Sequence, residues 1–168
     1  MNKDLENTFL NALENSKDKL LRICSSYTKD TDDAKDLFQE VLINIWQALP
    51  SFSGNASMST WMYRITLNVS LRYRTKLHRE KKRVSPFKSI AIEQIDVHNP
   101  VNQNQEKLIL LRNCVKTLND ADRAIITLYL EKLPYKEISN ITGLKENTIA
   151  VKVKRIKKKL LNCINDKL

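Results

Sequence analysis

Apolar residues recur every three or four positions along most of the chain, which is the spacing of an amphipathic helix. The pattern is clearest just after a polar break at residues 28–32. Its apolar positions there are Ala34, Leu37, Phe38, Val41, Leu42, Ile45, Trp46 and Leu49. Pro50 ends this helix, because proline cannot continue one, and Thr31 or Asp32 is placed to cap its start. The same spacing predicts further helices over residues 7–27, 61–83, 105–118, 135–142 and 146–162, and one that begins at Asn119 or Asp120.

The helical spacing stops between residues 84 and 104, a segment that contains Pro86, Pro100 and no firm period. A stretch of this kind is typical of a linker. The chain has only 2 Gly and 4 Pro among 168 residues, which favours helices over tight hairpins. We therefore predict an all-α protein of two small helical domains, residues 1–83 and 105–168, joined by a linker at residues 84–104.

Residues 134–160 have the pattern of a helix-turn-helix. Two short helical segments are joined by Gly143, which suits a turn that needs a positive φ. The apolar positions expected to face inward are Tyr135, Ile138, Ile141, Leu144, Ile149, Val153 and Ile156. The outer face of the second segment is basic, with Lys152, Arg155 and Lys159 in line and Lys154 and Lys158 beside them. A helix with one apolar stripe and one basic face can dock in the major groove of DNA.

A second basic run closes the helix predicted at residues 61–83. Residues 72–83 hold seven Lys or Arg and one Glu, and Trp61, Tyr63 and Tyr73 lie nearby. Aromatic rings can stack on unpaired bases while cations follow the backbone of a single strand. The whole chain carries 29 basic and 19 acidic residues, a net charge of +10, which attracts polyanions such as nucleic acid.

Metal, redox and catalytic chemistry are not indicated. Cys24, Cys114 and Cys163 form no Cys-x-x-Cys pair and the 2 histidines have no metal-ligand spacing, so we predict free thiols and no metal. The chain has no nucleophile motif and no Gly-rich phosphate loop, so no catalytic residue and no cofactor are expected. No signal peptide precedes the first helix and no apolar run approaches about 20 residues, so we expect a cytoplasmic protein with no membrane insertion.

Four stretches of the chain resemble the extracytoplasmic-function (ECF) group of sigma-70 family RNA polymerase sigma factors. Residues 33–40 (DAKDLFQE) and 59–68 (STWMYRITLN) resemble conserved region two of that family. Residues 133–149 (LPYKEISNITGLKENTI) and 151–160 (VKVKRIKKKL) resemble region four. The resemblance implies a non-enzymatic polymerase subunit. Its region-two domain (1–83) binds core polymerase and recognises and melts the minus-ten element, and its region-four domain (105–168) reads the minus-thirty-five element.

The resemblance also implies roles for particular residues. Those matching the contact with the clamp helices of the polymerase large subunit are Asp33, Asp36, Gln39 and Glu40. Those matching recognition and melting of the minus-ten element are Ser51, Phe52, Ser53, Gly54, Asn55, Trp61, Tyr63, Asn68, Arg72 and Arg74. Those matching recognition of the upstream element are Lys145, Glu146, Asn147, Thr148, Lys152, Lys154 and Arg155. Such proteins are commonly held inactive by an anti-sigma factor, which is an expected partner beside core polymerase and promoter DNA.

Two other classes of function fit part of the pattern. A stand-alone helix-turn-helix regulator accounts for residues 134–160 but leaves the second basic run and the acidic side of the helix after residue 32 without a role. A nucleic-acid enzyme such as a nuclease needs clustered carboxylates or histidines to hold a metal, and none stands out. Only the sigma-factor hypothesis predicts a stoichiometric complex with core polymerase.

Overall fold

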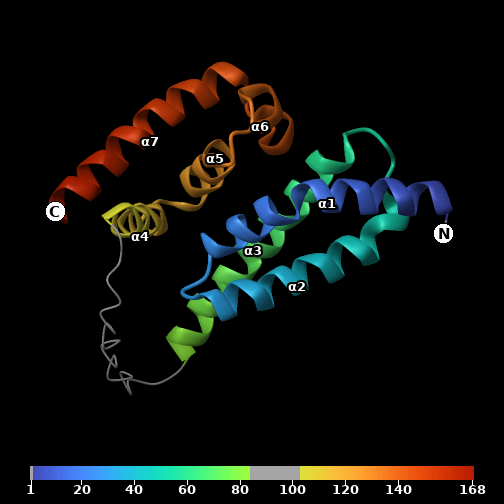
Figure 1. Ribbon diagram of the computed structural model, residues 1–168, viewed down its shortest axis with the longest axis horizontal. Coiled ribbons are helices and arrows are strands. Elements are labelled where there is room, and N and C mark those ends of the chain that lie inside the picture. Colours follow the sequence, from blue (N-terminus) through green and yellow to red (C-terminus); the bar gives the residue numbers. More distant parts are fainter. Residues whose placement is uncertain (1, 84–102) are drawn as a thin grey trace.

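The computed structural model describes residues 2–83 and 103–168, and all the elements in these two ranges are helical (Figure 1). The first domain consists of α1 (Lys3–Ser25), α2 (Thr31–Ala48), the short 3-10 helix η1 (Leu49–Ser51) and α3 (Met58–Arg83). The second consists of α4 (Gln103–Lys116), α5 (Asp120–Leu130), α6 (Tyr135–Thr142) and α7 (Glu146–Asp166). The all-α prediction is confirmed for these ranges. The predicted linker lies outside them, except for residues 103 and 104, which belong to α4.

The first domain is a three-helix bundle in which α1, α2 and α3 each pack against the other two. Its core contains the fully buried side chains of Leu20, Ile23, Leu37, Ile45, Leu49 and Met62. The start of α2 is capped by Asp30, whose Oδ1 accepts from the Asp33 N–H at 2.8 Å. The prediction that Thr31 or Asp32 caps this helix is therefore wrong. Both residues follow the cap and already belong to α2.

The start of α3 also lies earlier than predicted. The Ser57 hydroxyl accepts from the Thr60 N–H at 3.1 Å, so the helix begins at Met58 rather than Trp61. Met58 is buried, which gives the extra turn an apolar contact with the bundle. The polar loop between η1 and α3 is therefore shorter than a helix start at Trp61 would leave it.

In the second domain, α7 lies across α4, α5 and α6 and packs against all three. Asn119, one of the two predicted starts, caps α5 by accepting the Asp122 N–H at 2.8 Å. Gly143 has φ of 79° and ends α6 in the left-handed region, which confirms the predicted turn. The inner faces of α6 and α7 supply Ile138, Ile141, Ile149, Val153, Ile156 and Leu160 to the core.

The prediction of three free thiols is wrong for two of them. Cys114 on α4 and Cys163 on α7 form a disulfide across a sequence separation of 49 residues, with their Cα atoms 6.0 Å apart. The sequence did not reveal this pair because it depends on how α4 packs against α7. Cys24 is free and buried, as predicted.

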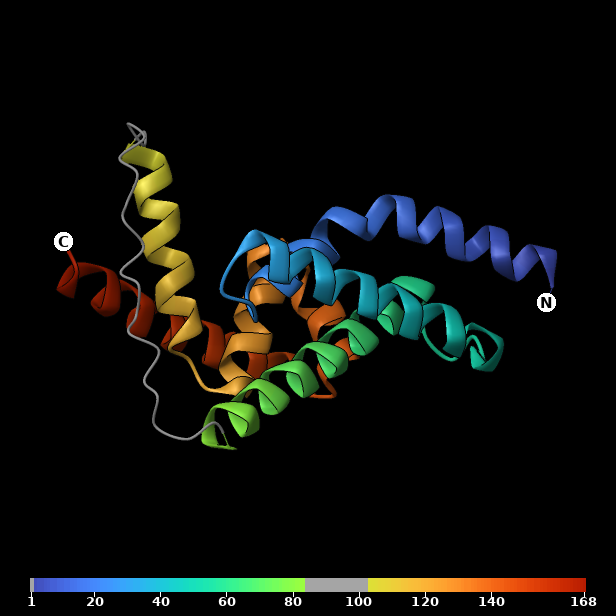
Figure 2. The same ribbon diagram turned by 90° about the horizontal axis from the view of Figure 1, so that it is seen from below.

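The two domains are in contact. Helix α6 packs against α3, and Figure 2 shows α5 and α6 beside the first domain. Arg22, in the last turn of α1, reaches Glu131, which directly follows α5.

Among the described helices, none has both the length and the apolar character needed to cross a membrane.

Candidate nucleic-acid interface

The helix-turn-helix formed by α6 and α7 presents the N-terminal half of α7 to solvent. Ile149, Val153 and Ile156 are buried on one side of α7. On the other side Lys145, Glu146, Asn147, Lys154 and Arg155 are exposed, while Thr148 and Lys152 are half-buried. The Ser139 hydroxyl donates to the Leu144 carbonyl at 2.5 Å and holds the turn closed. The exposed side chains of the first turns of α7 could therefore enter the major groove of DNA.

Two lysines of the same helix serve the second domain's own structure. Lys159 pairs with Asp122 of α5 at 3.4 Å, and Lys157 lies 4.5 Å from the centre of the Tyr129 ring. A hydrogen bond with Tyr129 is the main cause that raises the pKa of Lys157. The exposed basic face of α7 therefore consists of its first three turns and Lys158. Lys159, which was predicted to belong to it, faces α5 instead.

The second candidate surface is formed by the start of α3 and the loop before it. Ser51, Ser53, Gly54 and Asn55 are exposed, and Gly54 has φ of 77°. The half-buried rings of Phe52 and Trp61 pack together with centroids 5.2 Å apart. This aromatic pair anchors the loop to the first turn of α3, and the polar loop residues project beyond it.

Further along α3, the predicted DNA-facing residues divide into two groups. Asn68 and Arg72 are exposed, and Arg72 donates to Asn44 Oδ1 at 3.4 Å. Tyr63 is only 2% exposed, and burial raises its pKa to about 12. Arg74 forms an ion pair with Asp120 at the start of α5. In this structure Tyr63 is therefore buried and Arg74 is held in an ion pair. Asn68 and Arg72, in contrast, face solvent.

The acidic side of α2 forms a third surface. Asp36, Gln39 and Glu40 are exposed and Asp33 is half-buried. The pKa of Tyr73, on α3, is raised by burial and then by the carboxylates of Asp33, Asp30, Asp36 and Glu40. The basic half of α3 thus lies beside the acidic side of α2.

Sequence patterns missed an apolar extension of this acidic surface. Ile43 and Trp46 follow Glu40 along α2 and are 56% and 43% exposed. Trp46 had been predicted to face the core. It instead packs on Phe9, with ring centroids 5.7 Å apart and the ring planes tilted by 55°, and part of it is left in solvent. In the described part of the chain, no group of three or more His, Cys, Asp or Glu side chains could hold a metal ion.

Comparison with known proteins decides the family. Residues 13–80 match sigma-70 region 2, and residues 108–160 match sigma-70 region 4. The chain is 24% identical to the ECF sigma factor SigW of Bacillus subtilis over 96% of its own length and 91% of the relative's. It is 27% identical to the ECF sigma-E factor of Escherichia coli over 86% of its length and 80% of the relative's. This chain is an ECF sigma factor of the sigma-70 family.

Other similarities are partial or concern the fold alone. This chain is 38% identical to the ECF sigma factor SigG of Mycobacterium tuberculosis. That match covers only 40% of this chain and 18% of SigG. It aligns with the sigma factor RpoE of Bartonella quintana, solved with the anti-sigma factor NepR, at a TM-score of 0.67 and 21% identity, covering 98% of each chain. It also aligns with CnrH, solved with the cytosolic domain of CnrY, at a TM-score of 0.65 and 17% identity, covering 97% of this chain and 91% of CnrH.

Proposed function

We propose that this ECF sigma factor binds core RNA polymerase through α2 and brings it to promoters through two DNA-reading surfaces. The first domain, residues 1–83, recognises and melts the minus-ten element. The second, residues 105–168, reads the upstream element, and residues 84–104 link the two domains. Transcription initiation of this kind places the protein in the cytoplasm.

The observation that carries the proposal is the division of α7 into a buried apolar side and an exposed basic N-terminal half. The exposed first turn, with Lys145, Glu146 and Asn147, is placed to meet base edges. Lys154 and Arg155, more than one turn later, are placed to meet phosphates. Thr148 and Lys152, which are half-buried, lie between these two groups.

The minus-ten surface combines the polar loop with α3. Ser51, Phe52, Ser53, Gly54 and Asn55 form a rim beside Trp61, where a base removed from the duplex can be held. Asn68 and Arg72 continue from this rim along α3. Tyr63 is buried and Arg74 is paired with Asp120 in this structure, so neither adds to the exposed surface.

The polymerase contact is assigned to the clamp helices of the large subunit, through Asp33, Asp36, Gln39 and Glu40. Their exposure on a helix whose other side is core supports this role. An anti-sigma factor is a further proposed partner, because two proteins of similar fold were solved with such factors.

The test uses purified core polymerase and the full chain. Co-purification and run-off transcription from genomic fragments are expected to show a stoichiometric complex and initiation at a defined set of promoters. The variant Asp36→Lys with Glu40→Lys is expected to lose polymerase binding. A matched control, Glu106→Lys with Asp166→Lys, makes the same net charge change at exposed carboxylates of the second domain and is expected to bind polymerase as the parent does. Normal polymerase affinity of the α2 variant would overturn the assignment.

A further inference from the structure

Val151 is an apolar side chain on the exposed side of α7. It is 64% exposed, and among the large apolar residues of the described part of the chain only Leu168 is more exposed. The core contacts of α7 are made by a separate stripe that includes Ile149, Val153 and Ile156. Packing within the second domain therefore gives no reason for an apolar residue at position 151.

The geometry of the helix places Val151 opposite that buried stripe. Two residues turn an α-helix by about 200°, so Ile149 and Val153, each two positions away, both point to the other side. The positions three and four residues away, which share a face with Val151, are Asn147, Thr148, Lys154 and Arg155. Val151 therefore lies at the centre of the face that is proposed to read the upstream element.

Helix propensity does not explain a valine at this position either. Valine is β-branched and loses rotamer freedom in a helix, so alanine or lysine would favour the helix more at an exposed position. A protein-docking surface is marked by contiguous apolar groups, whereas all four neighbours on this face are polar. A single apolar side chain among polar ones fits a partner that offers a single apolar group.

Thymine offers such a group in the major groove of DNA. Its C5-methyl group lies among the hydrogen-bonding atoms of the base edges, and apolar side chains recognise it by contact. The side chain of Val151 has no donor or acceptor, so beside a G·C pair it would cover polar base atoms without pairing them. A valine in a helix keeps one strongly preferred rotamer, so the two methyl groups of Val151 are held in one direction.

We propose that Val151 recognises the C5-methyl group of a thymine in the upstream element and so selects an A·T pair at one position. The inference rests on the proposed function, because α7 must lie in the major groove for this contact to form. Asn147 lies one turn before Val151 and Arg155 one turn after it, each about 6 Å away along the helix axis. Val151 thus adds an apolar contact between the proposed base contact of Asn147 and the proposed phosphate contact of Arg155.

The experiment measures binding of the holoenzyme to the upstream element that it prefers in a library, with each thymine replaced in turn by deoxyuridine. Deoxyuridine pairs as thymidine does and lacks only the methyl group. We expect one replacement to weaken binding by the parent chain about threefold to fivefold, the effect of one buried methyl group. Val151→Ala is expected to bind the thymine-containing element at least as weakly. It is expected to show no further loss with deoxyuridine at that position, since the two changes remove the same contact.

The matched control is Leu161→Ala, which changes another exposed apolar side chain of α7. Leu161 is 59% exposed and lies beyond the basic half of the helix, so this variant is expected to bind and to discriminate as the parent does. Val151→Ala is expected to keep the helix content and the melting temperature of the parent, because Val151 makes no core contact.

Two results with DNA would overturn the proposal: tolerance of deoxyuridine at every thymine, or a Val151→Ala variant that stays as sensitive to deoxyuridine as the parent. Reduced affinity of Val151→Ala for core polymerase would assign Val151 to a protein contact and would also overturn it. A parent chain that forms no holoenzyme would overturn the proposed function and this inference with it. A holoenzyme that selects an element but ignores its thymine methyl groups would overturn the role of Val151 alone.

Discussion

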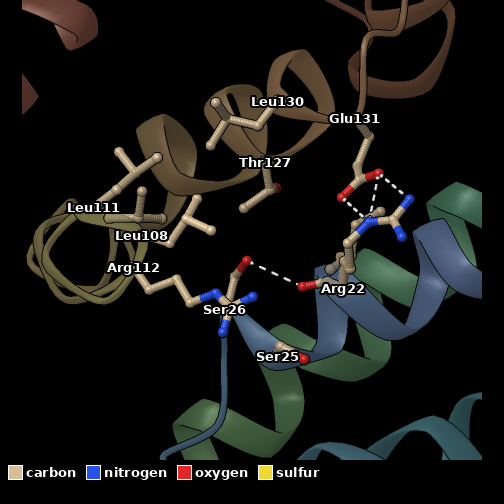
Figure 3. A pocket seen from close by; sticks show the side chains of 11 residues that line it. Arg22, Ser25, Ser26, Leu108, Leu111, Arg112, Thr127, Leu130 and Glu131 are labelled. Atoms are coloured by element: carbon tan, nitrogen blue, oxygen red, sulfur yellow. Dashed lines mark hydrogen bonds and ion pairs between the residues drawn. The ribbon is translucent and has the colours of Figure 1, made fainter. Parts of the chain in front are cut away.

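Arg22 and Glu131 stand 109 residues apart in the chain and form a two-point ion pair that joins the end of α1 to the end of α5. The pair lies at the edge of a cleft of about 230 Å³ that is also lined by Val115 of α4, and Figure 3 shows Leu108 and Leu111 of the same helix across the cleft from Arg22. The contact between the two domains is thus polar at this edge and apolar within the cleft.

Replacing Arg123 is expected to lower the stability of the protein more than replacing an exposed arginine. Arg123→Ala removes a donor to the carbonyls of Lys116, Leu118 and Ser26 and leaves a cavity beside Tyr27. We expect a loss of about 2–4 kcal/mol in the free energy of urea unfolding, because buried carbonyls are left without partners. Arg112→Ala, at an exposed position of α4, is the matched control and is expected to change that free energy by less than about 0.5 kcal/mol. Equal effects of the two variants would contradict the role of Arg123.

The disulfide between Cys114 and Cys163 is expected to stabilise the second domain. Closing a loop across a separation of 49 residues restricts the unfolded chain, a contribution of about 4 kcal/mol in the loop-entropy account. Dithiothreitol is therefore expected to lower the melting temperature of the oxidised protein. Cys163→Ser, which cannot form the bond, is expected to melt at one temperature with or without the reductant. A melting temperature of the parent chain that ignores dithiothreitol would show that the bond contributes nothing.

Asn147 and Arg155 are expected to contribute to upstream-element binding in different ways. Asn147, in the first turn of α7, is placed for base contact, so Asn147→Ala should change preference at one position by about 1–3 kcal/mol. Arg155 lies more than two turns later. Arg155→Ala should weaken all sequences alike and reduce the slope of log affinity against log salt by about 0.9. The measurement is holoenzyme binding to a library of upstream elements at two salt concentrations, and a sequence preference that shifts only with Arg155→Ala would reverse these roles.

The loop before α3 is expected to act in melting rather than in initial binding. Rearranging Ser53, Asn55 and Ala56 while keeping Gly54 and the Ser57 cap preserves the loop length, the positive φ of 77° and the start of α3. The rearranged loop should form open complexes on duplex promoters about tenfold more slowly or worse, because a flipped base loses its pocket. A premelted bubble template should recover most of this loss, since unpairing is already complete. Equal losses on duplex and bubble templates would point to a different role for the loop.

Much of this protein was predictable from local pattern. The α-helices of residues 2–83 and 103–168, the left-handed turn at Gly143 and the exposed basic N-terminal half of α7 follow from apolar periodicity and from the residue types at helix ends. These features depend on residues within a few turns of one another, so the sequence around each position contains the information. Even there, two helix starts were misplaced by one to three residues, because Asp30 and Ser57 compete with equally suitable neighbours as caps.

The remaining features depend on which faces meet, and apolar periodicity shows only that a face is buried, not what it packs against. Cys114 meets Cys163 because α4 packs against α7, and Trp46 packs on Phe9 of α1 yet stays 43% exposed. Tyr63 is buried where α3 packs against other helices. Arg22, Arg74 and Arg123 look alike in sequence as parts of a basic chain. Their carboxylate, carbonyl and aromatic partners lie on or beside other helices, and only the packing of those helices brings them into contact.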